Sequence, residues 1–287
     1  MNNSLIKLHA KSFYWASFFL SKEIFLKSSS LYNFCRTLDD IADSSEDLEL
    51  KKQKFLQFKN DFVNKNFNNK IIWEMWGVMK SENIQKIIVL DLFDGVETDL
   101  KEKVVVNSKK DLIIYSYRVA GTVGLMMSKI LKVEGKNALR GAINLGLAMQ
   151  FTNIARDIVE DKRRNREYIN HEFLSLKEVI NESEILYDKS FQAIKSIPLR
   201  SRFAVIVAMR VYRKIGYYIL KQKNIDTYNN AGKIYVPIHG KIIETFLSIL
   251  DFFKLLLIKN NNYINSNHEI LDKEINLDER IWLYNYR

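Results

Sequence analysis

Two pairs of aspartates have the residue type and the spacing to do chemistry together. Asp39 and Asp43 lie within RTLDDIAD, and Asp157 and Asp161 lie within NIARDIVED, far along the chain. Residues at positions i and i+4 lie one turn apart on the same face of a helix, so each pair directs two carboxylates to one place. Like charges at this spacing repel each other, and we therefore expect a cation to be bound between them.

The oxygen ligands indicate which cation this would be. Mg²⁺ keeps several of its waters and takes one or two carboxylates together with the phosphates of a substrate. Mn²⁺ also suits carboxylate and water ligands. The two pairs therefore predict a site for Mg²⁺, or for Mn²⁺ in its place, and a substrate that carries a diphosphate.

The segment around the second pair predicts a buried helix with one polar stripe. Residues 138–159 are apolar almost all round, which is typical of a core helix. Four polar residues recur at helical spacing along one side, three within this segment and one just beyond it: Gln150, Asn153, Asp157 and Asp161. Buried polar groups are costly unless they are satisfied, so this stripe predicts the lining of a cavity that holds metal, phosphate or water.

Arginines accompany both aspartate pairs. Arg36 lies one turn before the first pair, and Arg156 adjoins the second. A guanidinium group binds phosphate through two hydrogen bonds and stays charged, so we expect Arg36 to bind the substrate. Arg163 and Arg164, which follow the second pair, are either phosphate ligands or members of a solvated basic turn.

Five blocks of sequence extend these motifs over residues 9–216. They are HAKSFYWAS, LYNFCRTLDDIAD, YSYRVAGTVGLMMSKIL, LGLAMQFTNIARDIVEDKRR and IPLRSRFAVIVAMRVYRKIG. In this order they resemble the squalene/phytoene synthase family, with the closest likeness to bacterial phytoene synthases. The resemblance implies an all-α fold, a single-domain isoprenoid synthase bundle with a central cavity.

The resemblance also implies roles for individual residues. The implied metal ligands are Asp39, Asp43, Asn153, Asp157 and Asp161. The implied catalytic residues are the four aspartates with Tyr115 and Arg36. The implied substrate-binding residues are His9, Ser12, Tyr32, Arg36, Val119, Ala120, Gly124, Gln150, Asn153, Arg156, Arg166 and Tyr168. Among these, Val119, Ala120 and Gly124 would line a prenyl tunnel.

The implied activity is that of a prenyltransferase of carotenoid biosynthesis. It would join two geranylgeranyl diphosphates head to head through prephytoene diphosphate to give phytoene, with Mg²⁺ and without a nicotinamide cofactor. A C30 synthase that makes presqualene diphosphate, squalene or dehydrosqualene from farnesyl diphosphate would keep every motif and differ in tunnel depth. A non-catalytic assembly protein of the same fold is a further alternative, although such a protein is expected to lose the acidic ligands, and all four are present.

Three segments leave questions open. Where the family runs Gly-Arg-x-Tyr-Leu-Pro, residues 165–170 read NREYIN, so Arg166 and Tyr168 remain but the shaping glycine and proline are missing. Gly121 and Gly124 indicate a close approach either by another helix or by a ligand, because glycine weakens a helix interior. Beyond about residue 221 the likeness fades, and no catalytic role is expected there.

Composition narrows the class of protein. The chain has 287 residues with 10 Gly and 2 Pro, too few for a turn-rich β fold. Its one cysteine, Cys35, cannot form an internal disulfide and fits a structural role in a reducing compartment, so we expect a cytoplasmic protein.

The net charge of +10 is compatible with nucleic acid, a membrane surface or an anionic substrate as the partner. The basic residues are scattered without a nucleic-acid-binding motif, so the expected partners are prenyl diphosphates and the inner face of the membrane, by peripheral contact, but no nucleic acid.

The pattern along the chain predicts a main domain and a tail. Residues 1–258 form the expected isoprenoid synthase domain, and residues 259–287 a tail that Ile281, Trp282, Leu283 and Tyr284 could dock onto it. Residues 242–258 contain three charged residues and predict an amphipathic helix, not a membrane span, which either lies on a membrane or packs on the bundle. Breaks between helices are expected near 27–30, 64–69, 106–107, 133–136, 165–170, 196–198, 224–232 and 259–262.

Overall fold

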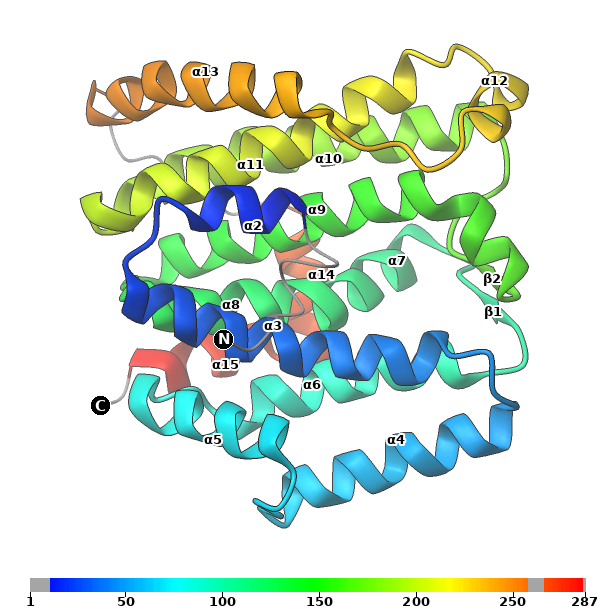
Figure 1. Ribbon diagram of the computed structural model, residues 1–287, viewed down its shortest axis with the longest axis vertical. Helices are drawn as coiled ribbons and strands as arrows, with labels where there is room; N and C mark the ends of the chain where they lie inside the picture. The colour runs from blue at the N-terminus through cyan, green and yellow to red at the C-terminus, as the bar shows by residue number, and fades with distance from the viewer. Residues whose placement is uncertain (1–10, 258–265, 286–287) are drawn as a thin grey trace.

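The helix that carries the second aspartate pair, α9 (Lys136–Arg163), runs through the middle of the molecule (Figure 1). The computed structural model describes residues 11–257 and 266–285. Against α9 pack α10 (Phe173–Ala193) and α11 (Leu199–Leu220) on one side and α8 (Thr122–Ile130) on the other. Helices make up almost all of the described chain, and the predicted all-α bundle is confirmed.

The other elements form layers on both sides of this centre (Figure 1). The upper edge consists of α12 (Ile225–Asn230) and α13 (Ile238–Leu257), and α4 (Leu48–Val63) lies at the lower edge. Between the centre and α4 lie α3 (Lys22–Asp43), α5 (Lys70–Glu82) and α6 (Lys86–Glu97). The remaining elements are α2 (Lys11–Ser17), the short helices η1 (Thr98–Leu100) and η3 (Ile194–Ser196), the π-helix η2 (Tyr117–Gly121), α7 (Lys109–Ser116), α14 (Ser266–Ile275), α15 (Leu277–Asn285), and the strands β1 (Val104–Val105) and β2 (Arg166–Glu167).

Polar side chains fix where several helices begin. Ser21 caps α3 by accepting a hydrogen bond from the backbone N–H of Ile24 at 3.4 Å, and Asp47 caps α4 in the same way. Such caps satisfy N–H groups that have no partner within the helix. The predicted break at 27–30 is wrong, because α3 continues through Ser28 and Ser29, which are both buried. The chain turns before Ser21 instead.

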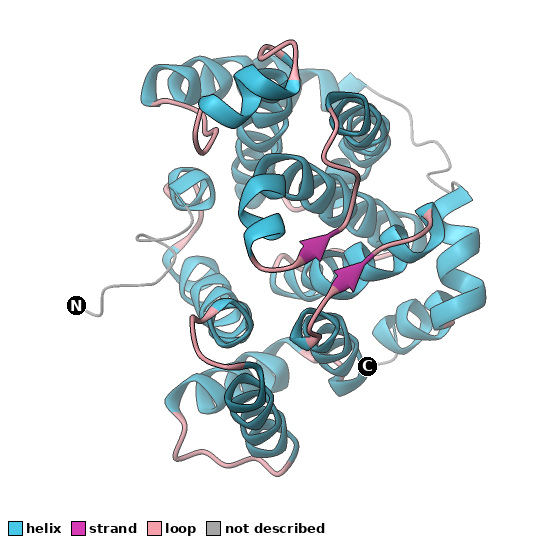
Figure 2. Ribbon diagram, turned by 90° about the vertical axis from the view of Figure 1, so that its right-hand side faces the viewer, coloured by secondary structure: helices cyan, strands magenta, loops and turns pink. Residues whose placement is uncertain are grey.

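Two short parallel strands close one end of the bundle (Figure 2). The N–H of Val104 donates to Asn165 O at 2.9 Å, and the N–H of Val106 donates to Glu167 O at 3.0 Å. Asn165 has φ 57°, in the left-handed region that favours glycine and that asparagine tolerates better than most residues. The asparagine therefore forms the left-handed turn at the position where the resemblance implies a glycine, and the strand pairing fixes Arg166 after it.

The backbones of η2 and α8 lie in direct contact with that of α9. A Cβ atom at Gly124 would lie 2.5 Å from Ala142 O, and one at Gly146 would lie 2.4 Å from Ala120 O. Atoms cannot approach so closely, so only glycine fits at these two positions. Gly124 therefore serves the packing of two helices, and its place along a prenyl tunnel stays a prediction.

The C-terminal helices attach to the bundle through buried charges. Arg140, on α9, forms ion pairs with Asp272 at 2.9 Å and with Asp278 at 2.7 Å. Arg280 donates two hydrogen bonds of 3.1 Å to Asp91 on α6. Leu271, Leu277 and Ile281 are buried beside these pairs, whereas the side chains of Trp282, Leu283 and Tyr284 and the expected break at 259–262 lie outside the described residues. The division into a domain and a tail stays a prediction.

Candidate active site

Both aspartate pairs lie at the C-terminal ends of their helices, and these ends meet where β1 and β2 pair (Figures 1 and 2). The C-terminus of a helix is the negative end of its dipole, so the backbone adds to the negative potential of the four carboxylates. On α9 the predicted stripe is half-buried along its length while most of the helix around it is fully buried. The stripe therefore lines a region that solvent enters.

In each pair, one aspartate is held by an arginine. Arg166 Nη1 donates to Asp43 Oδ1 at 2.7 Å, and its Nη2 donates to Ala42 O at 3.0 Å. Arg156 donates two hydrogen bonds, of 2.8 and 2.5 Å, to the carboxylate of the adjacent Asp157. Burial would raise the pKa of Asp157, but the hydrogen bonds and charge of Arg156, with the charge of Lys233, hold that pKa below its ordinary value.

The other aspartate of each pair is crowded by negative charge. Burial, and then the charge of Asp43, raise the pKa of Asp39 to about 7. Burial, and then the charge of Asp157, raise the pKa of Asp161 to about 7. Solvent reaches Asp39 although protein atoms surround it, as expected of a residue that lines an inward-facing cavity. The charges of Asp99 and Asp43 also raise the pKa of Asp161, so the two pairs face each other.

Asp99 is a site residue that the sequence analysis missed. The hydroxyl groups of Tyr115 and Tyr168 donate to its two carboxylate oxygens at 2.9 and 2.5 Å, and the two phenol oxygens lie 2.9 Å apart. The two rings stack with centroids 4.6 Å apart. Burial, and then the charge of Asp99, raise the pKa of both tyrosines, which therefore remain neutral hydrogen-bond donors. Asp99 lies in the acidic stretch VETDLKE, and no spacing signal in that stretch distinguishes it from solvated surface residues.

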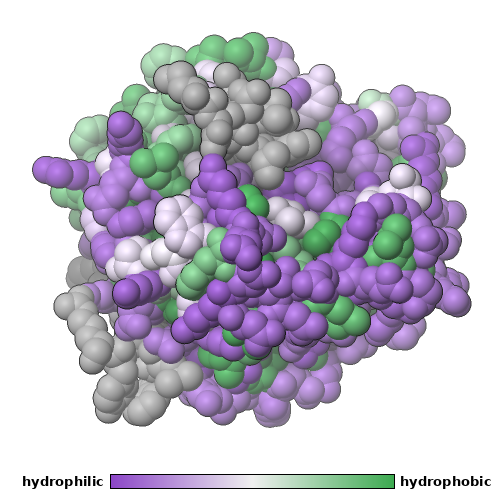
Figure 3. All heavy atoms as spheres, turned by 60° about the horizontal axis from the view of Figure 1, so that its bottom comes forward, coloured by the Kyte–Doolittle hydropathy of each residue, from purple (hydrophilic) through white to green (hydrophobic). Residues whose placement is uncertain are grey.

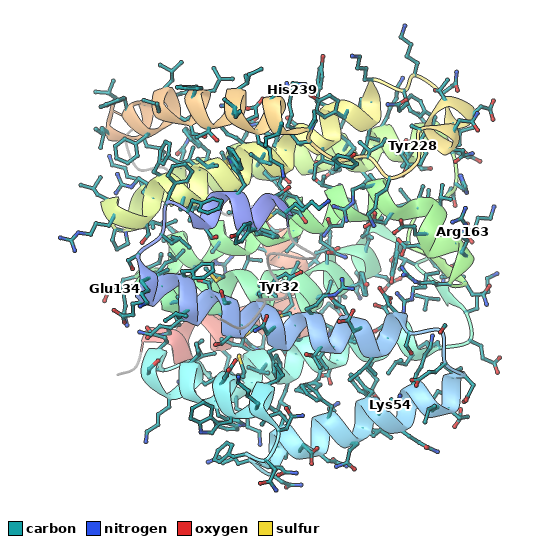
Figure 4. The ribbon with its side chains drawn as sticks, viewed as in Figure 1. Tyr32, Lys54, Glu134, Arg163, Tyr228 and His239 are labelled. Atoms are coloured by element: carbon teal, nitrogen blue, oxygen red, sulfur yellow. The ribbon has the colours of Figure 1, made fainter. Side chains whose placement is uncertain are left out.

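A second group of residues surrounds the upstream part of the stripe. Tyr212, on α11, donates to Asn153 Oδ1 at 3.1 Å, and Asn153 Nδ2 donates to Gln150 Oε1 at 3.3 Å. Burial raises the pKa of Tyr32 to about 12, and the charge of Tyr212 adds to this rise, so the two tyrosines are neighbours. Figure 4 shows Tyr32 on α3 near the middle of the view. Tyr212 was also missed, although it lies within the family block IPLRSRFAVIVAMRVYRKIG.

The segment after α11, where no catalytic role was expected, also reaches the second pair. Lys233 Nζ lies 3.3 Å from Asp157 Oδ1 and 2.7 Å from Glu160 Oε2. The hydroxyl of Tyr228 lies 2.8 and 2.6 Å from the carbonyl oxygens of Ala155 and Arg156. In Figure 4, Tyr228 and Arg163 both lie toward the end of the bundle at which α9 finishes. These contacts supply positive charge and hydrogen-bond donors to the C-terminal part of α9.

Two of the arginines expected around the substrate, Arg36 and Arg166, each keep one donor without a partner among the described residues. Arg36 pairs with Asp40 at 2.6 Å and not with the first aspartate of the motif. Among the described residues, the Nε atoms of Arg36 and Arg166 are buried without a hydrogen-bond partner. An unsatisfied buried donor is costly, and an anionic ligand would satisfy both. Arg163 is exposed, and Arg164 lies 3.5 Å from Asp43.

The remaining predicted residues are less closely connected with the aspartates. Ser12 is half-buried on α2, which packs against α11. Val119 and Ala120 are half-buried in η2, and π-helical turns are frequent at functional sites. His9 lies outside the described residues.

The carboxylates fit a divalent cation that the substrate helps to bind. Within residues 11–257 and 266–285, no three His, Cys, Asp or Glu side chains converge as a ready-made metal cage. Mg²⁺ does not require such a cage, because it takes one or two carboxylates and completes its shell with water and phosphate. The raised pKa values of Asp39 and Asp161 mark carboxylates whose repulsion a bound cation would relieve.

Comparison with known proteins defines the class. Residues 6–179, more than half of the chain, match the squalene/phytoene synthase family. The chain belongs to this family and is a prenyltransferase, and the family depends on divalent metal. The predicted family and the isoprenoid synthase fold are therefore confirmed.

Individual relatives and solved structures have names that specify an enzyme within the family. Over 257 residues the chain is 29% identical to 15-cis-phytoene synthase of Pantoea ananas, with 75% of this chain and 83% of the relative covered. Over 248 residues it is 28% identical to 15-cis-phytoene synthase of Enterobacter agglomerans, with 75% of this chain and 84% of that relative covered. The crystal structure of a dehydrosqualene synthase in complex with ligand is similar with a TM-score of 0.75 and 26% identity, covering 88% of this chain and 95% of the other. A squalene synthase from Alicyclobacillus acidocaldarius shares the fold, with a TM-score of 0.61 and 18% identity. The match covers 76% of this chain and 89% of the other.

Proposed function

We propose that this protein is a phytoene synthase, which condenses two geranylgeranyl diphosphates head to head through prephytoene diphosphate to phytoene. The observation that carries the proposal is the meeting of two helix ends that each bear an aspartate pair, with one aspartate of each pair held by an arginine. The similarity to relatives named 15-cis-phytoene synthase supports the C40 product.

The aspartates of both motifs, with Asn153, would hold the metal. When bound, the metal would supply positive charge to neutralise the diphosphate leaving group. Arg36 and Arg166 bind the diphosphate through Nε donors that have no partner in the part of the chain that the structure describes. Arg156 keeps Asp157 ionised, so that this carboxylate is available as a ligand.

The neutral tyrosines provide donors where charge develops. Tyr115 and Tyr168 are held in one orientation by Asp99 and by their stacked rings. Fixed donors in a site poor in water stabilise the charge that appears as the allylic C–O bond breaks. The resulting cation is attacked by the 2,3 double bond of the second substrate, and loss of a proton gives prephytoene diphosphate. A second ionisation, a rearrangement and a further proton loss give phytoene.

Apolar side chains must exclude water from the carbocations, because capture by water would end the sequence as an alcohol. Phe13, whose ring centroid lies 4.9 Å from that of Tyr212, supplies such a surface beside Asn153. Cys35 packs against the core, and burial raises the pKa of its thiol, which fits a structural role in a reducing compartment such as the cytoplasm. In the described part of the chain, no helix has both the length and the apolar character needed to cross a bilayer.

A C30 synthase is the second candidate. The similarity to a dehydrosqualene synthase, at 26% identity over most of both chains, favours it. This alternative keeps the same aspartates, arginines and tyrosines, and for dehydrosqualene it changes only the length of the prenyl chain, whereas squalene would also require a hydride donor.

The test is incubation of the purified protein with Mg²⁺ and, separately, with farnesyl and geranylgeranyl diphosphate, followed by mass analysis of the extracted hydrocarbon. A dominant C40 product is expected. Only a C30 product would transfer the proposal to the second candidate. A protein that makes neither a hydrocarbon nor a cyclopropylcarbinyl diphosphate from either substrate would contradict both.

A further inference from the structure

Helix α13 covers α11 with the polar side of an amphipathic helix. Glu244 and Ser248 of α13 are buried toward α11. Arg210 of α11 pairs with Glu244 at 2.9 Å and with Asp251 at 2.5 Å. Lys214 also reaches Glu244, at 3.4 Å. Ion pairs therefore attach the polar side of this helix to the bundle.

The apolar side of the same helix points away from the protein. Phe246 and Leu250 are 67% and 66% exposed, and Leu257 is 86% exposed. Together with these residues, the outer side consists of Ile242, Ile243, Ile249, Phe253 and Leu256, which are all exposed. We call these eight residues the α13 face. Their spacing is that of one helical face, but a helix on a water-soluble surface directs such a face toward the core.

The surface beneath α13 explains this orientation. A cleft of about 540 Å³ lies between α10, α11 and α13. Its charged lining includes Glu184, Asp188, Arg210, Arg213 and Lys214. Turning α13 over would place apolar side chains against these charges and leave the arginines without their partners, which is costly. The outward apolar face is therefore built into the packing.

Aromatic side chains of α2 and its C-terminal turn extend the apolar surface. Trp15 Nε1 donates to Thr245 Oγ1 at 2.9 Å and so ties α2 to α13. The ring of Phe19 lies 5.0 Å from that of Phe203, which lies 6.3 Å from that of Phe252. Phe18, which follows α2, is exposed. A contiguous patch of this kind marks a surface for a partner or a membrane.

Charge decides between a bilayer and a second copy of the chain. The only acidic residues of α13 are Glu244 and Asp251, and both are turned inward and paired. Lys254 is exposed near one end of the helix, where its ammonium lies 5.6 Å from the centroid of the Phe191 ring at the rim of the cleft, and His239 lies on α13 at the upper edge of the molecule (Figure 4). A second copy would bring another chain of net charge +10 against this one, whereas anionic lipid headgroups would be attracted to it.

We propose that α13 is a membrane-docking helix, which lies in the plane of an anionic lipid bilayer with the α13 face among the acyl chains. Amphipathic helices bind in this way through buried apolar area and attraction between cations and anionic lipid. The proposal goes beyond the reaction and does not depend on it. It names the element through which the expected peripheral contact with a membrane occurs.

The test measures sedimentation of the whole protein with vesicles of phosphatidylglycerol and phosphatidylcholine. The wild type is expected to bind, and the double variant Phe246→Glu with Leu250→Glu is expected to bind about tenfold less or weaker still, because two large apolar side chains no longer enter the lipid. Vesicles of phosphatidylcholine alone are expected to bind the wild type less than the anionic mixture does.

Leu56→Glu is the matched control. Leu56 is 50% exposed on α4, at the opposite edge of the molecule from α13 (Figure 1). The face that Figure 3 turns toward the viewer, on the α4 side, is mostly hydrophilic with scattered apolar side chains. The control is expected to bind vesicles like the wild type. Melting temperatures verify that each variant is folded, and Leu257→Glu replaces the double variant if the latter does not fold.

Three results would overturn the proposal. They are a wild type that binds no vesicles, a folded α13 variant that binds as well as the wild type, and a wild-type dimer in light scattering that the α13 variant converts to a monomer without any vesicle binding. The last result would assign the α13 face to a second copy. None of these measurements involves turnover, so the outcome is independent of the proposed reaction.

Discussion

The two aspartate motifs have the same layout, but their charges are balanced in different ways. On α9, Asp157 is held by the adjacent Arg156, so this balance is local. On α3, Asp43 is held by Arg166, which comes from β2 and is brought there by the pairing of two short strands. The first motif therefore depends on tertiary structure and the second mainly on its own helix.

This difference shows how the site tolerates four carboxylates at two helix ends. One aspartate of each pair is paired with an arginine, and the other has a raised pKa. The protein thus compensates one part of the charge, and we propose that a bound metal neutralises the other part. Substitutions can separate these two parts.

The largest effect is expected from Asp39→Asn and Asp157→Asn. Each removes a proposed metal ligand, so turnover should fall by about 10²–10³-fold or more. Asp39→Asn should keep or raise the melting temperature because it relieves repulsion, whereas Asp157→Asn should lower it because Arg156 loses its partner. Activity and thermal melting are measured on the same samples, with Asp94→Asn on the surface of α6 as the control. Wild-type turnover in either site variant would refute the proposed metal site.

Asp99→Asn should have the next largest effect. The amide has only one acceptor oxygen for two phenols, so Tyr115 and Tyr168 lose their fixed orientation. We expect kcat to fall by about 10–100-fold, as for other groups that orient site residues. Circular dichroism should show an unchanged helix content. Unchanged kinetics in the variant would mean that this tyrosine pair does not need its carboxylate partner.

Arg166→Met should affect stability most directly. It leaves Asp43 and Ala42 O without their donor, and we expect a loss of about 1–3 kcal/mol in the free energy of unfolding. Arg163→Met, at an exposed arginine, should change that free energy by no more than about 0.5 kcal/mol. Urea unfolding measures both. Equal effects of the two substitutions would contradict the view that the first motif depends on β2.

The smallest effect is expected from Ala120→Phe, which examines the space beside α9. If Ala120 lines the prenyl tunnel, the ring should block its deeper part and raise the rate with farnesyl diphosphate relative to geranylgeranyl diphosphate. Overpacking of a filled site would instead cost about 1–3 kcal/mol of stability. Relative rates on both substrates and the melting temperature distinguish these effects. An unchanged ratio in a stable, active variant would show that Ala120 does not measure the chain.

The sequence predicts those features of the fold that depend on local spacing. The aspartate pairs, the polar stripe of α9 and the breaks near 64–69, 133–136 and 196–198 follow from residue type and periodicity. The break expected at 27–30 fails because serine also fits a helix interior, and burial of Ser28 and Ser29 decides the outcome. Residue spacing also predicts that α13 is amphipathic. It does not predict which side of α13 faces outward, because this orientation depends on the charged cleft beneath the helix.

The site residues that sequence reasoning missed all depend on contacts between distant segments. Asp99 becomes a partner of two tyrosines only because η1, α7 and the residue after β2 meet at one end of the bundle. Lys233 reaches Asp157 from a segment with no motif. The sequence pattern does not predict the pairing of β1 with β2. Without this pairing, no sequence signal connects these residues with the aspartate motifs.

The π-helical turns of η2 set the phase between α7 and α8. A π-turn holds one residue more than an α-turn. One residue corresponds to about 100° of rotation around an α-helix. Deleting one residue from 117–121 would therefore restore plain α geometry and rotate α8 relative to α7 by roughly this angle. Tyr115 would keep its direction toward Asp99, whereas Gly124 would no longer meet α9, so the length of this short segment aligns the end of the bundle that carries the candidate site with its packed interior.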